Sequence, residues 1–288
     1  MSTSGLPDLV RDLPHLRALV ESWHRAGLRV GVVPTMGALH QGHLSLVRRA
    51  AAETDRVIVT IFVNPRQFNS AADLAAYPRT EEADRLKLDG QGATLIYAPD
   101  GDTIYPPGFA TTVSVEGLSE GLCGAYRPGH FAGMATVVTK LFTQTQADLA
   151  YFGEKDFQQL KIVQRLAVDL DLSITVIGCP TLREADGLAM SSRNVRLSSE
   201  ARAIAPVLYA ELQYLAGKLA EGRRMADVVD AAKRLIVAGG YQAVEYLELR
   251  AEADLAPLDT PLVPARLLVA AWLDGTRLID NIAVPSLV

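Results

Sequence analysis

The strongest constraint on the fold is a regular alternation of strand-like and helix-like segments up to about residue 180. Residues 56–63 (RVIVTIFV) form an apolar run continuous enough to predict a strand buried on both faces. Further strands are predicted at 28–33, 93–97, 147–152 and 173–177, and helices at 43–54, 80–88, 131–143 and 154–170. Repeated β-α-β order predicts an α/β fold with a Rossmann-like parallel sheet, in which ligands bind beyond the carboxyl ends of the strands.

The pattern changes after about residue 181. Two long helices are predicted at 198–219 and 226–238, followed by three strand-like segments at 243–250, 266–273 and 277–282. Asp274-Gly275 between the last two segments is a strong signal for a two-residue hairpin. We therefore expect residues 1–181 to form a Rossmann-like domain and residues 182–288 to form a smaller α+β domain.

Composition excludes several classes of protein. The chain has 288 residues, is 49% hydrophobic and carries a net charge of −5, which is typical of a globular enzyme and disfavours a nucleic-acid partner. No apolar stretch approaches the roughly 20 residues needed to cross a bilayer, and no secretory signal is visible. The two cysteines, Cys123 and Cys179, have no metal-ligand spacing and are expected to be buried thiols. These features predict a cytoplasmic protein without a membrane partner.

The motif His40-Gln41-Gly42-His43 follows the first predicted strand closely and opens a helical pattern. Two histidines three residues apart lie on one side of a first helical turn, whose unpaired backbone N–H groups attract anions. Gly37 permits a tight turn, and Gly42 lets a ligand approach the helix start. The motif therefore favours binding of a nucleotide's phosphates, although capping of the helix would also explain the histidines, and zinc would need a third ligand.

A second cluster, residues 152–159 (FGEKDFQQ), also lies where a strand becomes a helix. Lys155 and Gln159 are four residues apart and are expected to share a helix face. Lysine suits a phosphate, and Asp156 can accept hydrogen bonds from ribose hydroxyls. The alternative is an ordinary solvated helix start with Glu154 and Asp156 in its first turn.

Two further segments carry polar groups suited to a substrate. Ser191, Ser192 and Arg193 follow one another near the domain junction and can cradle a polyphosphate, although a loop rich in Ser and Asn is otherwise ordinary. Gln67 leaves the end of the second strand, where its amide can bind a hydroxylated substrate or act as a simple turn residue.

Together these clusters resemble a known family. The strings PTMGALHQGH, FVNPRQF, YFGEKDFQQL and LREADGLAMSSRN are similar to those of the pantoate–β-alanine ligases, within the nucleotidyltransferase superfamily that carries the H-x-G-H motif. The resemblance runs through essentially the whole chain. It departs from the common pattern at Gln41, Asn69 and Phe157, where Glu, Gly and Tyr are frequent. None of the three departures removes a group that the family's chemistry requires.

The resemblance implies that the chain joins (R)-pantoate to β-alanine with ATP, through pantoyl adenylate, releasing AMP and pyrophosphate. It implies catalytic roles for His43, His40 and Lys155, and binding of pantoate and β-alanine by Gln67 and Gln159. The residues implied for ATP are Met36, Gly37, His40, Gly42, His43, Gly153, Glu154, Lys155, Asp156, Leu182, Met190, Ser191, Ser192 and Arg193. It also implies Mg²⁺, for which Asp84 is a weak candidate ligand, a homodimer, and a C-terminal domain that closes over the active site.

Two other functions remain open at this point. A different H-x-G-H nucleotidyltransferase, such as a cytidylyl- or adenylyltransferase, would release pyrophosphate with a phosphorylated substrate and would not depend on an amine. A nucleotide-sensing protein would bind ATP without turnover.

Overall fold

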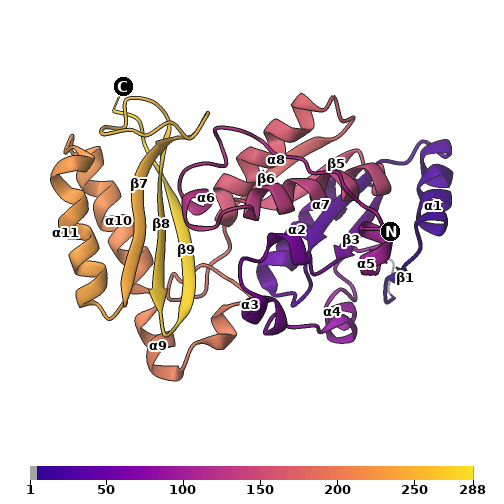
Figure 1. Ribbon diagram of the computed structural model, residues 1–288, viewed down its shortest axis with the longest axis horizontal. Coiled ribbons are helices and arrows are strands. Elements are labelled where there is room, and N and C mark those ends of the chain that lie inside the picture. The colour runs from indigo at the N-terminus through magenta and orange to yellow at the C-terminus, as the bar shows by residue number, and fades with distance from the viewer. Residues whose placement is uncertain (1–4, 288) are drawn as a thin grey trace. The chain divides into compact units, whose positions relative to one another are not determined.

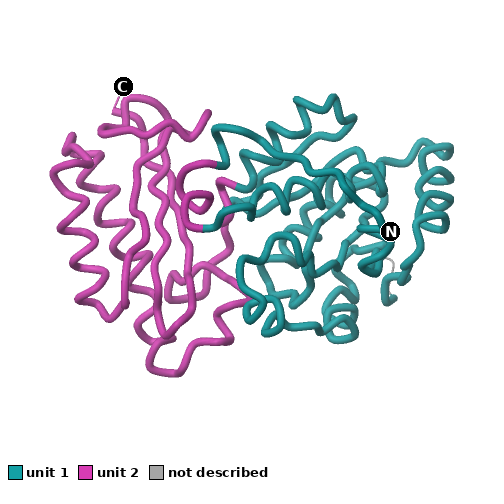
Figure 2. Tube along the Cα trace, viewed as in Figure 1, with its two compact units in different colours: residues 1–119, 127–154, 159–180 teal, residues 120–126, 155–158, 181–288 magenta. Residues whose placement is uncertain are grey.

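The chain folds into two compact units (Figure 2), and the computed structural model describes residues 5–287. The first unit takes the described residues up to Ser119 together with Arg127–Glu154 and Gln159–Pro180. The second unit takes the described residues from Thr181 onward and also two short earlier segments, Glu120–Tyr126 and Lys155–Gln158.

A six-stranded sheet forms the centre of the first unit (Figure 1), in the order β1-β4-β3-β2-β5-β6. All five neighbouring pairs are parallel, which confirms the predicted Rossmann-like class. The strands are β1 (Asp8–Val10), β2 (Val30–Thr35), β3 (Arg56–Ile61), β4 (Leu95–Tyr97), β5 (Leu149–Gly153) and β6 (Thr175–Cys179). The four central residues of β3 are buried, as its continuous apolar run predicted.

The strand order changes direction between β2 and β5. From β2 the chain continues to β3 and then β4 on one side, while β5 pairs with β2 on the other and is followed by β6. Ligands of open parallel sheets bind at this kind of switch point, beyond the carboxyl ends of the two strands. The loop after β2 and the segment after β5 therefore lie where a ligand is expected.

Helices and short 3-10 turns connect these strands. Helix α2 buries Leu44, Leu46, Val47 and Ala50, which are spaced for one helix face, in a core that includes Val33, Val57 and Val59 of the sheet. The elements up to residue 180 that belong wholly or largely to this unit are α1 (Leu13–Arg25), α2 (Gln41–Glu53), η1 (Pro65–Gln67), α3 (Ala71–Ala75), α4 (Glu81–Lys87), α5 (Gly101–Ile104), α7 (His130–Thr145) and α8 (Phe157–Asp169).

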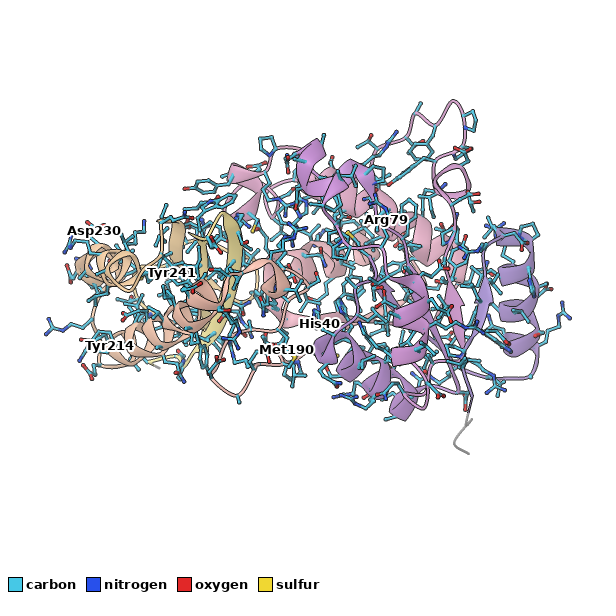
Figure 3. The ribbon with its side chains drawn as sticks, turned by 90° about the horizontal axis from the view of Figure 1, so that it is seen from below. His40, Arg79, Met190, Tyr214, Asp230 and Tyr241 are labelled. Carbon is cyan, nitrogen blue, oxygen red and sulfur yellow. The ribbon has the colours of Figure 1, made fainter. Side chains whose placement is uncertain are left out.

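The second unit is an α+β structure. Its antiparallel sheet has the order β7-β8-β9, and helices α10 and α11 pack against this sheet around a core of Leu, Ile, Val and Ala side chains. Tyr241, labelled in Figure 3, is buried in that core and donates its hydroxyl to the Ala205 carbonyl at 2.8 Å. The elements are α6 (Cys123–Tyr126), η3 (Asn194–Arg196), α9 (Ser199–Ile204), α10 (Val207–Ala220), α11 (Met225–Ala238), β7 (Ala243–Ala251), β8 (Ala265–Leu273) and β9 (Thr276–Val284).

The predicted hairpin is confirmed. Asp274 and Gly275 join β8 to β9 with φ values of 50° and 66°, the left-handed pair that a type I′ turn requires. The predicted single helix over 198–219 is wrong, because it is divided into α9 and α10 at Pro206. Ala205 and Pro206 both keep right-handed helical backbone, but proline has no N–H to donate to a carbonyl of the preceding turn, so the helical hydrogen-bond pattern is interrupted there.

Several other elements also differ from expectation. Lys155 lies in a 3-10 turn, η2 (Glu154–Asp156), and α8 begins only at Phe157, so Lys155 and Gln159 do not share a regular helix. Strand β1 and helix α1 had no counterpart in the sequence prediction. Among residues 5–287, no helix is both long enough and apolar enough to cross a membrane.

Candidate active site

The two histidines of the H-x-G-H motif cap the start of α2 (Figure 3 labels His40). His40 is the N-cap residue, and its Nδ1 accepts a hydrogen bond from the Gly42 N–H at 3.1 Å. The Nδ1 of His43 accepts from the His40 N–H at 3.4 Å, and the two rings lie 4.1 Å apart between centroids. Because Nδ1 is the acceptor in both rings, each neutral imidazole carries its proton on Nε2. The helix start therefore presents two imidazole N–H donors of the same tautomer.

The loop between β2 and α2 is shaped by buried hydrogen bonds. Gly37 has φ of 79°, and its N–H donates to the Thr35 hydroxyl at 3.1 Å. The next two N–H groups, of Ala38 and Leu39, both donate to the carboxylate of Asp84. These bonds hold the backbone that leads to His40, so the position of the first histidine depends on a residue in α4.

Asp84 does not have the surroundings of a metal ligand. Its side chain is 0% exposed, and both carboxylate oxygens already accept hydrogen bonds. Within residues 5–287, no group of three or more His, Cys, Asp or Glu side chains is placed to hold a metal ion. The expectation that Asp84 binds Mg²⁺ is therefore not supported by the geometry.

Gln67 is oriented by Asn64, a residue that the sequence did not single out. Asn64 follows β3 and is 1% exposed; its Nδ2 donates to Gln67 Oε1 at 2.9 Å and to the Gly133 carbonyl at 3.1 Å. Its Oδ1 accepts from the Tyr105 hydroxyl at 2.8 Å. Burial raises the pKa of Tyr105 to about 12, so this hydroxyl stays protonated and remains a donor at neutral pH.

This chain of hydrogen bonds determines the direction of the Gln67 amide. Because Gln67 Oε1 is occupied as an acceptor, the Nε2 group is the donor, and it lies 3.2 Å from the sulfur of Met36. The structure thus brings together two of the residues singled out from the sequence. The side-chain amide that Gln67 offers a substrate is its N–H₂ end.

The backbone of Gln67 is held from the start of helix α7 and from the residues just before it. Its carbonyl accepts from Nδ1 of His130 at 2.8 Å and from the Arg127 guanidinium at 3.2 Å. A carbonyl only accepts, so His130 carries its proton on Nδ1, unlike His40 and His43. Gly133 allows α7 this close, because a Cβ there would lie 2.1 Å from the Arg66 carbonyl oxygen. No local signal in the sequence marks Tyr105, Arg127 or His130 as supports of this segment.

The remaining predicted residues of the first unit lie after β5. Gly153 is the last residue of that strand, Glu154 follows in η2, and Gln159 lies in the first turn of α8 and is half-buried. Strand β5 pairs with β2 through Gly31–Leu149 and Val32–Ala150. The structure therefore places the predicted residues at the ends of the two strands that flank the switch point.

In the second unit, β9 anchors two predicted phosphate-binding segments. Asn281 donates from its Nδ2 to the Lys155 carbonyl at 2.9 Å, while its Oδ1 accepts from Arg266 at 2.7 Å. Its neighbour Asp280 is 4% exposed and binds the Arg183 guanidinium through both oxygens, at 2.6 and 2.9 Å. The two anchors lie 126 and 97 residues from the residues they hold, which is why local patterns could not reveal them.

Arg183 begins a turn that leads to the Ser-rich loop. Residues Arg183 and Ala189 form an isolated antiparallel bridge, and the Met190 N–H donates to the Leu182 carbonyl at 3.0 Å. The Ser191 hydroxyl accepts from the Arg193 N–H at 3.2 Å. Ser192 and Arg193 are both half-buried. The loop is thus a defined turn in which the Ser191 hydroxyl is bound by the backbone of Arg193.

Lys155 and Asp156 are close to each other in the same unit. The Lys155 ammonium lies 3.7 Å from the Asp156 carboxylate, and the lysine side chain is 18% exposed while that of the aspartate is 48% exposed. The Lys155 ammonium also lowers the pKa of the buried carboxylate of Asp280, so it acts on at least two carboxylates. A mostly buried ammonium of this kind is suited to attract a phosphate as well.

A parallel α/β sheet with a histidine-capped helix at its switch point has the features of a nucleotide-binding enzyme. Comparisons with known proteins specify the family. The family model described as pantoate-beta-alanine ligase matches residues 8–283. The chain belongs to this family.

Individual relatives agree over nearly the whole length. A pantothenate synthetase from Chelativorans is 66% identical over 276 residues, covering 96% of this chain and 97% of the relative, and one from Ruegeria pomeroyi is 60% identical over 279 residues, covering 97% and 98%. The crystal structure of the Thermus thermophilus enzyme superimposes with a TM-score of 0.89 at 44% identity, covering 96% of this chain and 99% of that one. The Francisella tularensis ligase, solved in complex with beta-gamma ATP and beta-alanine, gives 0.82 at 32% identity, with 96% and 97% covered.

Proposed function

We propose that the protein joins pantoate to β-alanine at the expense of ATP, by way of pantoyl adenylate. The observation that carries this proposal is the pair of Nε2–H donors at the start of α2, within a chain that matches a family of pantoate–β-alanine ligases over nearly its whole length. Pantoate's carboxylate attacks the α-phosphorus of ATP and expels pyrophosphate. The amine of β-alanine then attacks the activated carbonyl carbon and expels AMP.

The first step requires positioning rather than a reactive side chain. A carboxylate is ionised at neutral pH, so it needs no general base before it attacks phosphorus. What accelerates the step is alignment of the two reactants and stabilisation of the charge on the phosphoryl oxygens. His40 and His43 suit that task, because their shared tautomer presents N–H donors at a helix N-terminus that itself attracts anions.

Gln67 and Gln159 are assigned to pantoate. The N–H₂ end of Gln67 is the donor in this structure, and it suits the hydroxyl or carboxylate oxygens of an acid such as pantoate. Met36, Gly37 and Gly42 lie on the same loop and helix start as the two histidines, and we assign them, with Gly153 and Glu154, to ATP.

The second unit is assigned to the nucleotide as well. Lys155, Ser191, Ser192 and Arg193 supply ammonium, hydroxyl and guanidinium donors for phosphates, and Asp156 supplies a carboxylate for ribose hydroxyls. Leu182 and Met190 flank the turn that carries the serines, and their backbone is assigned to the nucleotide.

Mg²⁺ is proposed to arrive bound to ATP, where it neutralises triphosphate charge. The described residues provide no cluster that would hold the ion, and Asp84 is already satisfied by other donors. We also propose that the protein works in the cytoplasm and that it forms a homodimer. Light scattering of the purified protein would test the oligomeric state.

The experiment that tests the function measures pyrophosphate and AMP separately. With ATP and pantoate alone, pyrophosphate should form, and AMP should appear in steady state only when β-alanine is added. Pyrophosphate release that needs a phosphorylated substrate and ignores the amine would indicate a cytidylyl- or adenylyltransferase instead. ATP binding with no release of either product would indicate a sensor.

The His43→Ala variant tests the role of the histidine pair. Removing one N–H donor to a charged transition state costs about 10²-fold or more in rate, so adenylate formation should fall by that factor. Stopped-flow measurement of pyrophosphate release gives this rate directly. Near-normal release from the variant would show that His43 does not stabilise the transition state.

A further inference from the structure

Helix α4 contains a fully buried carboxylate that the proposed mechanism does not use. Asp84 is 0% exposed, although its helix otherwise carries exposed charged residues such as Glu82 and Lys87. A buried carboxylate is costly unless it is paired and fully hydrogen-bonded. Its presence here therefore calls for a specific set of donors.

The structure supplies four donors to Asp84. Oδ2 accepts from the Ala38 N–H at 2.7 Å and from the Thr80 hydroxyl at 3.0 Å. Oδ1 accepts from the Leu39 N–H at 2.8 Å and lies 3.5 Å from the Lys87 ammonium. Lys87 also donates to the Leu39 carbonyl at 2.8 Å. The carboxylate and the ammonium thus hold both backbone polar groups of the residue directly before His40.

The loop needs such support because its backbone is unfavourable on its own. Gly37 and Ala38 both have positive φ, at 79° and 50°, and an alanine in this region is strained. A Cβ at Gly37 would lie 3.1 Å from Asp84 Oδ2, so the carboxylate fits closely against the turn. The hydrogen bonds from Ala38 and Leu39 compensate for this conformation, and they fix the point at which His40 begins the helix.

We propose that Asp84, assisted by Lys87, is a positioning residue for adenylate formation: it sets the backbone of Ala38 and Leu39 and thereby the position of His40 and His43. The proposal rests on the function proposed above. It assigns Asp84 neither to substrate nor to metal. Displacing a reacting group by about 1 Å can cost about 10²-fold in rate, so a loop support can matter as much as a contact.

The decisive variant is Asp84→Asn. The asparagine has the same shape, but its amide N–H₂ faces one of the two backbone N–H groups and leaves that donor unpaired. We expect pantoate-dependent pyrophosphate release to fall by about 10- to 100-fold in kcat, with the KM for ATP changed by less than about threefold. The matched control is Glu82→Gln, an exposed carboxylate on the same helix, which should leave the rate unchanged.

A second measurement separates positioning from general damage. When synthetic pantoyl adenylate and β-alanine are supplied, the adenylation step is bypassed, and Asp84→Asn should release AMP at close to the unmodified protein's rate. Equal losses in both half-reactions would overturn the proposal, as would an unchanged adenylation rate. Recovery of adenylation by raised Mg²⁺ would also overturn it, in favour of a metal ligand.

Lys87→Met keeps the proposal testable if Asp84→Asn does not fold. The Lys87 side chain is 45% exposed, so its loss is tolerable, but it removes the bond to the Leu39 carbonyl. We expect adenylation to slow by about 3- to 10-fold, the effect of one such hydrogen bond, with the second half-reaction unaffected. No slowing would overturn the proposal. Failure of the proposed function itself would appear separately, as the absence of pantoate-dependent pyrophosphate release from the unmodified protein.

Discussion

The Arg183–Asp280 pair gives the sharpest test of how the second unit is held together. Asp280 is 4% exposed and Arg183 is 17% exposed; the guanidinium also donates to the Gly187 and Asn281 carbonyls and lies 3.7 Å over the ring of Tyr209. Arg183→Met keeps much of the aliphatic volume but leaves the carboxylate buried without its counter-ion. Breaking a buried pair in this way costs about 3–5 kcal/mol of unfolding free energy.

The loss of unfolding free energy in Arg183→Met should depend on pH with a defined sign. Burial raises the pKa of Asp280 above its usual range, and Arg183 opposes that shift. In Arg183→Met the main opposing charge is gone and only the weaker attraction of Lys155 remains, so the pKa rises further and the folded state binds a proton that the unfolded state releases. Stability then falls as pH rises through the window between the unfolded and folded pKa values. The destabilisation should be full at pH 8 and smaller at pH 5, by up to about 1.4 kcal/mol for each pH unit within that window.

The two tryptophans make the measurement specific to this unit. Trp23 lies in α1 of the first unit and Trp272 in β8 of the second, so a Trp23→Phe background reports unfolding of the second unit by fluorescence in urea. Arg202→Met is the matched control, because its pair with Asp186 is 34% and 42% exposed and is worth about 0–1 kcal/mol. Adding Asp280→Asn to Arg183→Met should recover most of the loss. The reasoning is refuted by a loss under about 1 kcal/mol, by equal losses at both pH values, or by a double variant that is no more stable.

Three further predictions follow from the first unit. Tyr105→Phe removes the donor that orients Asn64. The KM for pantoate should rise by about 3- to 10-fold while the KM for ATP stays constant, and an equal rise in both would contradict the assignment of Gln67 to pantoate. Gly133→Ala places a Cβ 2.1 Å from a carbonyl oxygen and should destabilise by about 1–3 kcal/mol, so an unchanged melting temperature would be contrary evidence. Burial raises the pKa of Cys179 to about 11. Iodoacetamide at pH 8 should therefore label this thiol far more slowly in folded than in unfolded protein, as followed by mass spectrometry, and equal rates would show an accessible thiol.

All strands except β1, and the longer helices except α1, were predictable because each follows from a pattern of a few neighbouring residues. The apolar run at β3, the amphipathic spacing of α2 and the Asp274-Gly275 turn are local signals, and the structure confirms all three. The prediction of a single helix over 198–219 was wrong for a local reason too. Pro206 lies within a periodic apolar pattern, and the pattern was followed although the proline interrupts the helix.

The supports of the candidate site could not be predicted in the same way. Asp84 is 46 residues from Ala38, Tyr105 is 41 from Asn64, and Asp280 is 97 from Arg183. Such pairs can be predicted only when the sheet order is known. Nothing near Asp84 in the sequence distinguishes it from the exposed acids around it. Its place in the acidic segment 81–84 made it a candidate Mg²⁺ ligand, whereas the structure shows a buried carboxylate that accepts from backbone N–H groups.

The same arrangement recurs around each predicted substrate-binding segment. Asp84 holds the residues before His40, Asn64 holds Gln67, and Asn281 holds the backbone of Lys155. Each support is a buried polar side chain with several hydrogen bonds, at least one of them to the main chain or side-chain amide of the segment it holds. A reaction in which an ionised carboxylate attacks phosphorus gains little from a stronger nucleophile or base, and much from alignment of charges. We therefore expect the residues that set the rate to include ones that never touch the substrate.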